Sequence, residues 1–289
     1  MRYNDYITKL GFTDEDLAIL SDIDRTIRNE YSTDFSFARV EYDKGDKAFE
    51  NYLFSLAKRS KIPVNTLNLY LYLIFAEDSY REYQNLGIED EVFIKTMTSF
   101  SVASHLALSI GQEFGLVQPL YRECYRRELG CRLFTLGRLS FELVESPCDL
   151  EIDGKCISKG NLCVSVHIPR FEPFNEDICE TSYSLARKFF KKHFGLKQVF
   201  FICHSWMLYP WLREVLPETS SILQFHRKFK IYKVDENNKG IAWIFGAGTG
   251  LYKEVESIDN LPEDTMLRRA AKHRLKEGKC LGVGHGIRL

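Results

Sequence analysis

The stretches Leu162-Cys-Val-Ser-Val-His167 and Gln198-Val-Phe-Phe-Ile-Cys203 decide how the second half of this chain folds. Each is a short apolar run of the kind that forms a buried strand, and a helical pattern over Glu176–Phe194 separates them. Histidines stand where the runs end, His167 in the first and His204 directly after the second. Because ligands gather at the carboxyl ends of strands in open α/β sheets, we expect a site at these two histidines.

Composition narrows the class of protein. The 289 residues are 45% hydrophobic and 13% aromatic, which suits a buried core in one large or two ordinary domains. Thirty-nine basic and 40 acidic residues leave a net charge of −1, which argues against a nucleic-acid partner. The start lacks the apolar core of a signal peptide, and the longest apolar run, Leu67–Ala76, is too short to span a bilayer. The eight cysteines form no Cys-x-x-Cys pair, so we expect reduced thiols in a cytoplasmic protein without membrane contact.

The first part of the chain has helical periodicity throughout. We expect helices that begin at Asp14 and that cover Asp46–Ser60, Val64 to about Leu86 and Asp90 to about Phe114. The third of these is apolar around most of its circumference, which is typical of the central helix of a bundle. The break at Gly115-Leu-Val-Gln-Pro119 predicts a domain boundary, with a helical domain over 1–118 and a second domain over 119–289.

The second part alternates between strand and helix patterns. A hairpin is expected over Arg132–Glu145, and beyond Trp206 the chain predicts further elements in the order helix, helix, strand, strand, helix and a Gly-rich tail. Their expected ranges are Pro210–Leu216, Ser220–Phe225, Lys228–Val234, Ile241–Phe245 and Pro262–Glu277. The fold class predicted is therefore α+β, a helical bundle followed by a mixed sheet with helices on both faces.

Five motifs carry a resemblance to a known family. They are Phe134-Thr-Leu-Gly-Arg-Leu-Ser-Phe-Glu142, Val166-His-Ile-Pro169, Ser184-Leu-Ala-Arg-Lys-Phe-Phe190, Cys203-His-Ser-Trp206 and Ser221-Ile-Leu-Gln-Phe225. The chain resembles a family of bacterial N-acyltransferases that pair a helical N-terminal domain with a domain like the second half of the GNAT acyl-CoA N-acyltransferases. The resemblance implies acyl-CoA or acetyl-CoA as co-substrate, and an amine on a small molecule or peptide as acceptor.

Acyl transfer to an amine needs a base for the amine and an acid for the leaving thiolate. His204 and His167 are the candidate bases, since both end neighbouring strands. The resemblance adds Glu142, a sheet carboxylate, as a catalytic candidate, and Tyr209 as a general acid at the start of the next helix. Candidate substrate-binding residues are Ser205, Trp206 and Arg170.

The loop Pro169–Asp177 departs from the GNAT pattern. GNAT enzymes hold the CoA pyrophosphate on a Gly-rich loop with the signature Arg/Gln-x-x-Gly-x-Gly/Ala, and this loop has no glycine. Asn175 is an expected N-cap, and the nearby acids would repel a phosphate: Glu172, Glu176, Asp177 and Glu180. A non-catalytic binding or assembly protein with a degenerate GNAT fold is therefore the alternative.

Other chemistries find less support. A hydrolase built on Ser205 and His204 is a third hypothesis. Cys203 adjoins His204, but neighbouring residues of a strand point to opposite faces and would not touch. Gly246-Ala-Gly-Thr-Gly250 is expected to be a turn, because it fits neither a P-loop nor a Rossmann spacing. The seven histidines have no His-x-x-x-His or His-Glu-x-x-His spacing, so no metal is expected.

Overall fold

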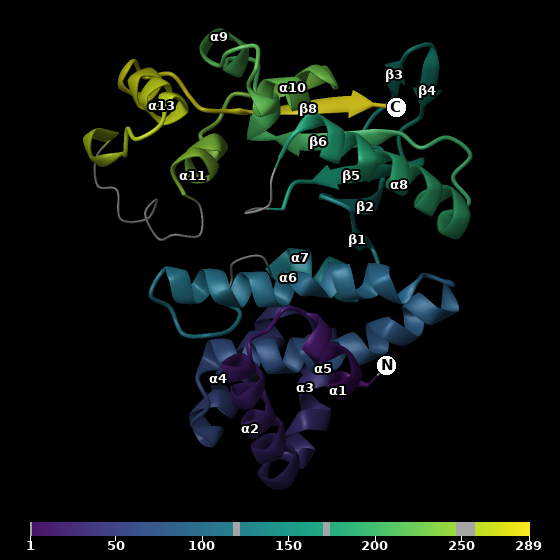
Figure 1. Ribbon diagram of the computed structural model, residues 1–289, viewed down its shortest axis with the longest axis vertical. Helices are drawn as coiled ribbons and strands as arrows, with labels where there is room; N and C mark the ends of the chain where they lie inside the picture. Colours follow the sequence, from purple (N-terminus) through teal and green to yellow (C-terminus); the bar gives the residue numbers. More distant parts are fainter. Residues whose placement is uncertain (1, 118–121, 170–173, 247–257) are drawn as a thin grey trace. The chain divides into compact units, whose positions relative to one another are not determined.

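The structure is a computed structural model that describes residues 2–117, 122–169, 174–246 and 258–289. The chain forms two compact units, Met1–Phe134 and Thr135–Leu289 (Figure 1). The boundary near residue 118 stays a prediction. Within the described ranges, none of the helices combines the length and the apolar composition that crossing a bilayer requires.

Helices build the first unit. The expected helices that begin at Asp14, Asp46, Val64 and Asp90 are all present, and a further helix over 32–44 joins the first two. The elements are α1 (Tyr3–Tyr6), η1 (Ile7–Lys9), α2 (Asp14–Glu30), α3 (Ser32–Lys44), α4 (Asp46–Ser60), α5 (Val64–Asn85), α6 (Asp90–Ser109) and α7 (Arg122–Leu129).

Helix α5 is the centre of this unit, as its apolar circumference predicts. Every residue from Leu67 to Ala76 is buried. Tyr72 is fully buried, and its ring meets those of Tyr42 and Phe49 with centroids 5.6 and 5.8 Å away. Such edge-to-face contacts add to the stabilisation that burial gives.

Glu128 of α7 is an acid buried in this core. Its side chain is 4% exposed, and it accepts a hydrogen bond of 2.7 Å from the Ser99 hydroxyl. Burial raises the pKa of Glu128 to about 8, which the bond from Ser99 only partly offsets. The folded protein therefore favours the neutral acid, whereas the unfolded chain ionises near the ordinary pKa of 4.5.

We predict that Glu128→Gln stabilises the protein above pH 5. The stabilisation should grow as the pH rises and reach about 2–4 kcal/mol near pH 8, because the unfolded wild type gains by ionising and the variant cannot ionise. Urea unfolding of both proteins between pH 5 and pH 8 measures this difference. Glu123→Gln is the matched control on the same helix, because Glu123 is 78% exposed. Equal stability of wild type and Glu128→Gln at pH 8 would refute the prediction.

A mixed sheet organises the second unit. Its strands lie in the order β1-β2-β5-β6-β8-β7, and a separate hairpin pairs β3 with β4. The strands are β1 (Leu133–Leu136), β2 (Leu139–Glu145), β3 (Leu150–Ile152), β4 (Lys155–Ile157), β5 (Leu162–His167), β6 (Phe201–Ser205), β7 (Lys230–Asp235) and β8 (Val283–Arg288). Neighbours β5 and β6 are parallel, while β8 is antiparallel to both β6 and β7. The predicted class, a helical part followed by a mixed sheet, is confirmed.

Helices of this unit follow the prediction with one exception. They are α8 (Glu176–Phe194), η2 (Trp206–Leu208), α9 (Leu212–Val215), α10 (Ser221–Arg227), α11 (Lys239–Phe245), η3 (Ile258–Asn260) and α13 (Met266–Lys276). The strand predicted over Ile241–Phe245 is wrong, because this run forms α11. Its apolar residues Ile244 and Phe245 enter a cluster with α9 and α13, so tertiary packing overrides the β preference of the run.

The two faces of the sheet are covered differently. Tyr183 of α8 packs between Phe141 of β2 and Phe201 of β6, with ring centroids 5.7 and 5.0 Å away. On the opposite face, the β3–β4 hairpin covers an apolar cluster that includes Cys163 and Ile287. The remaining end of that face carries polar side chains.

The Gly-rich tail is a strand inside the sheet, which the sequence did not predict. Strand β8 lies between β6 and β7, although both precede it in the chain. Figure 1 shows it beside β6. Its glycines face closely packed neighbours. A β-carbon on Gly284 would lie 2.1 Å from the Leu208 carbonyl oxygen, and one on Gly286 would lie 2.7 Å from the Phe229 β-carbon. Glycine in a strand often marks such an approach.

We predict that Gly284→Ala destabilises the protein by about 3 kcal/mol or more, because a backbone carbonyl occupies the space of the new methyl group. Gly160→Ala is the control: Gly160 has a φ of +83° but nothing within 4 Å of the added carbon, so it should cost about 1–2 kcal/mol from backbone strain alone. Thermal and urea unfolding compare the two. A cost for Gly284→Ala no greater than the control would contradict this packing.

Candidate active site

The parallel strands β5 and β6 pair over a short length and then part. Their register joins Val164 with Phe201 and Ser165 with Ile202, and the Val164 amide donates to the Phe200 carbonyl at 2.9 Å. Strand β5 continues to His167 and β6 to Ser205 without further pairing between them. Among the residues that the structure describes, the backbone groups of these strand ends that face one another therefore have no strand partner and can bind another group.

One face of the sheet carries a row of polar side chains across this opening. Side chains two residues apart on a strand share a face, and directly paired residues share it too. Both strand-end histidines lie on one face by this rule. Ser165 of β5 pairs with Ile202 of β6, and His167 and His204 each stand two residues further along these strands. The pairs Ser140–His167 and His204–His285 extend the same face to β2 and β8. The same rule adds Glu142 of β2 and Asp235 of β7.

His167 is paired with a carboxylate. Its Nε2 lies 2.9 Å from Oε2 of Glu142, and the two side chains are 31% and 11% exposed. The contact is diagonal across β2 and β5, since Ser140 and not Glu142 stands directly opposite His167. The predicted candidates Glu142 and His167 are thus brought together as a histidine–carboxylate pair, an arrangement that orients an imidazole.

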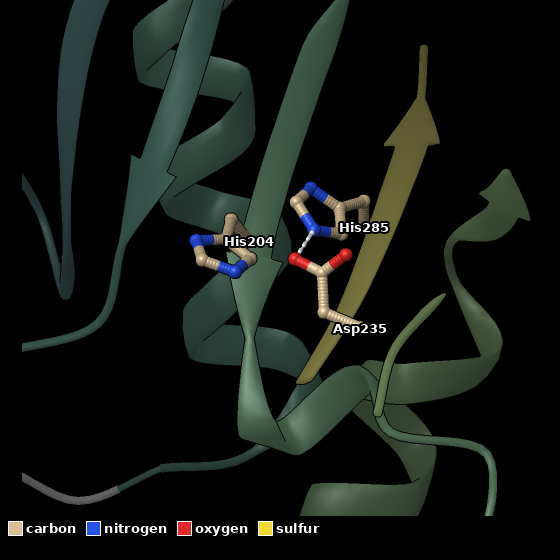
Figure 2. Close-up of side chains that lie close together, drawn as sticks. All are labelled: His204, Asp235 and His285. Atoms are coloured by element: carbon tan, nitrogen blue, oxygen red, sulfur yellow. Dashed lines mark hydrogen bonds and ion pairs between the residues drawn. The ribbon is translucent and has the colours of Figure 1, made fainter. Parts of the chain in front are cut away.

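His204 lies in a second group, formed with His285 and Asp235 (Figure 2). The rings of His204 and His285 are stacked, with centroids 4.2 Å apart and an angle of 21° between their planes. His285 Nε2 lies 2.9 Å from Asp235 Oδ2. Among the described residues, neither ring nitrogen of His204 has a hydrogen-bond partner, and the side chain is exposed.

Electrostatics keep His204 neutral. Its pKa lies below the ordinary value, first because partial desolvation disfavours the charged ring and then because of charge on His285 and Lys239. The pKa of Asp235 falls to about 2, because Lys233 and His285 bind the carboxylate. At neutral pH, His204 therefore presents an uncharged imidazole that can accept a proton.

The other candidates near His204 are held by local contacts. The Ser205 hydroxyl accepts a bond of 3.1 Å from the Met207 amide and caps η2. Trp206 is half-buried against the α9–α11–α13 cluster. The Tyr209 hydroxyl donates to Glu236 at 2.6 Å and accepts from Arg274 at 3.0 Å, and burial is the first cause that raises its pKa to about 12.

Cys203 is unsuited to nucleophilic attack. It is 2% exposed, and burial raises the pKa of its thiol to about 12. A nucleophilic cysteine needs an accessible thiolate. All eight cysteines are free thiols in the structure.

The start of α8 holds a pocket beside strand β8. Asn175 caps the helix by accepting a bond of 3.0 Å from the Ile178 amide, as predicted. Two of the acids expected to repel a phosphate have cationic partners. Glu176 pairs with Lys228, and Glu180 receives two bonds of 3.0 Å from Arg288. These four side chains line the pocket together with Phe174, Ser221 and Phe225 among others.

Arg170 and Glu172 of the preceding loop lie outside the described residues, as do residues 247–250 of the expected glycine turn. Within the described part of the loop, the paired acids reduce the repulsion that the sequence predicts. Each ion pair leaves the carboxylate charged but places a cation beside it, so the charges of these acids and their partners nearly balance.

Sequence reasoning missed His285 and Asp235. His285 stands in a run where glycines hide the alternation of Val283, His285 and Ile287. Asp235 lies one residue beyond the expected strand Lys228–Val234. The period-two pattern of the tail was the available signal. Its low β propensity concealed it, because Gly is depleted in strands.

Solved structures share this fold. An acyltransferase in complex with CoA and 10C-teicoplanin is 20% identical with a TM-score of 0.67, and covers 100% of this chain and 99% of its own. An acyltransferase with decanoyl-CoA and teicoplanin is 20% identical with a TM-score of 0.65 and the same coverage. An acyltransferase mutant with octanoyl-CoA is 24% identical with a TM-score of 0.64; the match covers 78% of this chain and 66% of that one. No curated protein sequence matches.

Family comparisons divide the chain in the same order as the fold. Residues 1–118 match the N-acyltransferase N-terminal domain, and residues 133–288 match the GNAT-like C-terminal domain. The second match alone covers more than half of the chain. The resemblance drawn from the sequence motifs is thereby confirmed, and the chain belongs to the family of N-acyltransferases with a GNAT-like C-terminal domain.

Proposed function

We propose that this protein transfers an acyl group from an acyl-CoA thioester to an amine, at the place where β5 and β6 part. The observation that carries the proposal is the pair of strand ends that part with His167 and His204 on one face of the sheet. A thioester chain held by the unpaired backbone groups of β5 and β6 would lie beside both histidines. The family supports the reaction class.

The donor is a fatty acyl-CoA of medium length in this proposal. Structures with the same fold hold octanoyl-CoA and decanoyl-CoA, and one of them holds teicoplanin as well. We infer an amine on a small molecule or a peptide as acceptor for this chain.

His204 is the proposed base. The amine nitrogen attacks the thioester carbonyl carbon, the new C–N bond forms, and the C–S bond breaks as CoA leaves as a thiolate. The neutral ring of His204 accepts the proton that the amine loses and then returns it to the thiolate. The products are an amide and the CoA thiol, so that atoms and charge balance.

The remaining candidates have supporting roles in this scheme. His167 and Glu142 form a fixed pair that can bind the acceptor or the thioester carbonyl. Tyr209, with a pKa of about 12 and both bonds of its hydroxyl satisfied within the fold, is a weaker acid than the imidazolium of His204. We therefore assign Tyr209 to the support of Glu236 and the strand end.

His204→Ala should lower kcat/KM for amine acylation by decanoyl-CoA about 10²–10³-fold, the usual contribution of a general base. Binding of decanoyl-CoA should change little, because the ring serves the proton transfer. Mass spectrometry of the amide and of free CoA, with a panel of primary amines as acceptors, measures the rate. Calorimetry measures binding.

A matched control is His273→Ala, whose side chain is 76% exposed on α13 and which should leave both quantities unchanged. If His204→Ala retained wild-type kcat/KM, His204 would not be the base. Failure of decanoyl-CoA and acetyl-CoA to bind the wild type at all would instead favour the non-catalytic alternative.

The pocket at the start of α8 is the proposed place of the CoA phosphates, because Lys228 and Arg288 line it beside the acids that they pair with, Glu176 and Glu180. Lys228→Gln should raise the Kd for decanoyl-CoA about tenfold, the loss of one charge-assisted bond. Decanoyl-pantetheine, which lacks the nucleotide, should bind wild type and variant equally. Lys230→Gln is the control, since the Lys230 ammonium bonds the Glu151 carbonyl at 3.1 Å. Equal loss for both ligands would exclude a phosphate contact by Lys228.

A further inference from the structure

Three side chains from neighbouring strands form a compact group on the open end of the sheet face (Figure 2). His204 of β6 stands directly opposite His285 of β8, and Asp235 of β7 stands opposite Val283, two residues from His285. The strands fix the three α-carbons relative to one another. A site built on paired strands holds its ligands with more precision than one built on loops.

The donor atoms are close enough to share one ion. Each residue offers one, and all three lie within 4.8 Å of one another. For three such atoms there is always a point within about 2.8 Å of each, whereas zinc binds imidazole nitrogen at about 2.0–2.1 Å and carboxylate oxygen at about 2.0–2.2 Å. In distance alone, the three donor atoms are therefore less than about 1 Å from the positions that metal bonds require.

We propose that His204, His285 and Asp235 form an open three-ligand site for a divalent transition-metal ion. The lone pairs of an imidazole lie in the plane of its ring, so the stacked ring of His204 has to turn to reach the ion. It is exposed, and among the described residues no hydrogen bond holds it. His285 exchanges its bond to Asp235 for a shared contact with the metal.

Donor chemistry sets the class of ion. Two imidazoles and one carboxylate suit nickel, zinc, copper or cobalt, whereas magnesium and calcium prefer sites made of oxygen. Lys233 pairs with Asp235 at 2.8 Å, and Lys239 adds positive charge near His204. The positive charge of these two lysines repels a bound metal ion and weakens its binding. The site therefore suits reversible binding rather than a permanent structural metal.

Occupation of the site has a consequence for catalysis, which rests on the proposed function. An ion on His204 uses the lone pair that would accept the amine proton, so the metal would inhibit acyl transfer reversibly. Binding of the ion itself does not depend on the reaction. The two claims can therefore fail separately.

Titration of the full chain with Ni²⁺ by calorimetry tests the site, because nickel favours imidazole over the thiol groups that complicate zinc. We expect one ion per chain, and a Kd raised at least about 100-fold by His285→Ala and at least about tenfold by Asp235→Asn. His167→Ala, which removes the other histidine of this face, should bind nickel like the wild type. Cys280→Ser should do the same and exclude a thiol contribution.

His204→Ala supplies a second test if His285→Ala fails to fold, because His204 is exposed. It should also abolish the one-to-one binding. The proposal is overturned if the wild type takes up no nickel in the micromolar range, or if His204→Ala binds it as tightly as the wild type. Loss of binding in His167→Ala would place the site elsewhere.

Discussion

The close approach of strand β8 to the turn after β6 is the constraint on which the second unit depends. Gly284 leaves the space that the Leu208 carbonyl needs, and a methyl group there would lie 2.1 Å from its oxygen. Because β8 fits between β6 and β7, the last residues of the chain complete the sheet. The same strand then supplies His285 to one face and Arg288 to the other, so that one packing condition positions both the histidine group and the pocket at α8.

Charge is distributed so that this arrangement suits a polar ligand. Arg288 is 8% exposed, it holds Glu180 with two bonds of 3.0 Å, and its guanidinium lies 3.8 Å from the centre of the Tyr183 ring. A buried guanidinium needs such partners, because desolvation is costly. On the opposite face, a row of three histidines and two carboxylates lies beside the apolar cluster under the β3–β4 hairpin. The sheet thus separates a pocket that is lined by two ion pairs from a face that carries histidines and carboxylates.

Local patterns predicted most of the fold. The ranges Asp46–Ser60, Leu162–His167 and Glu176–Phe194 agree with the structure, since each has strong periodicity and clear end signals. The sequence could not predict what depends on distant packing. Strand β8 lacks β propensity and exists because β6 and β7 accept it, and Ile241–Phe245 becomes helix because its apolar side chains enter a cluster with α9 and α13. The site was half predicted for the same reason. His167 and Glu142 lie on predicted strands and His204 directly follows one, whereas His285 and Asp235 depend on the place of β8.

The parting of β5 and β6 is the feature that joins the fold to the proposed chemistry, because it leaves backbone groups for a thioester chain beside His204. Hydrogen–deuterium exchange with and without decanoyl-CoA measures this most directly. We predict that the Ile168 amide, which faces β6 just beyond the last pair of the two strands, exchanges fast in the free protein and is protected by decanoyl-CoA. The Val164 amide, which already donates to Phe200, should be protected in both states. If decanoyl-CoA binds and protects amides elsewhere but leaves the exchange of Ile168 unchanged, the acyl donor does not lie between these strands and the account is wrong.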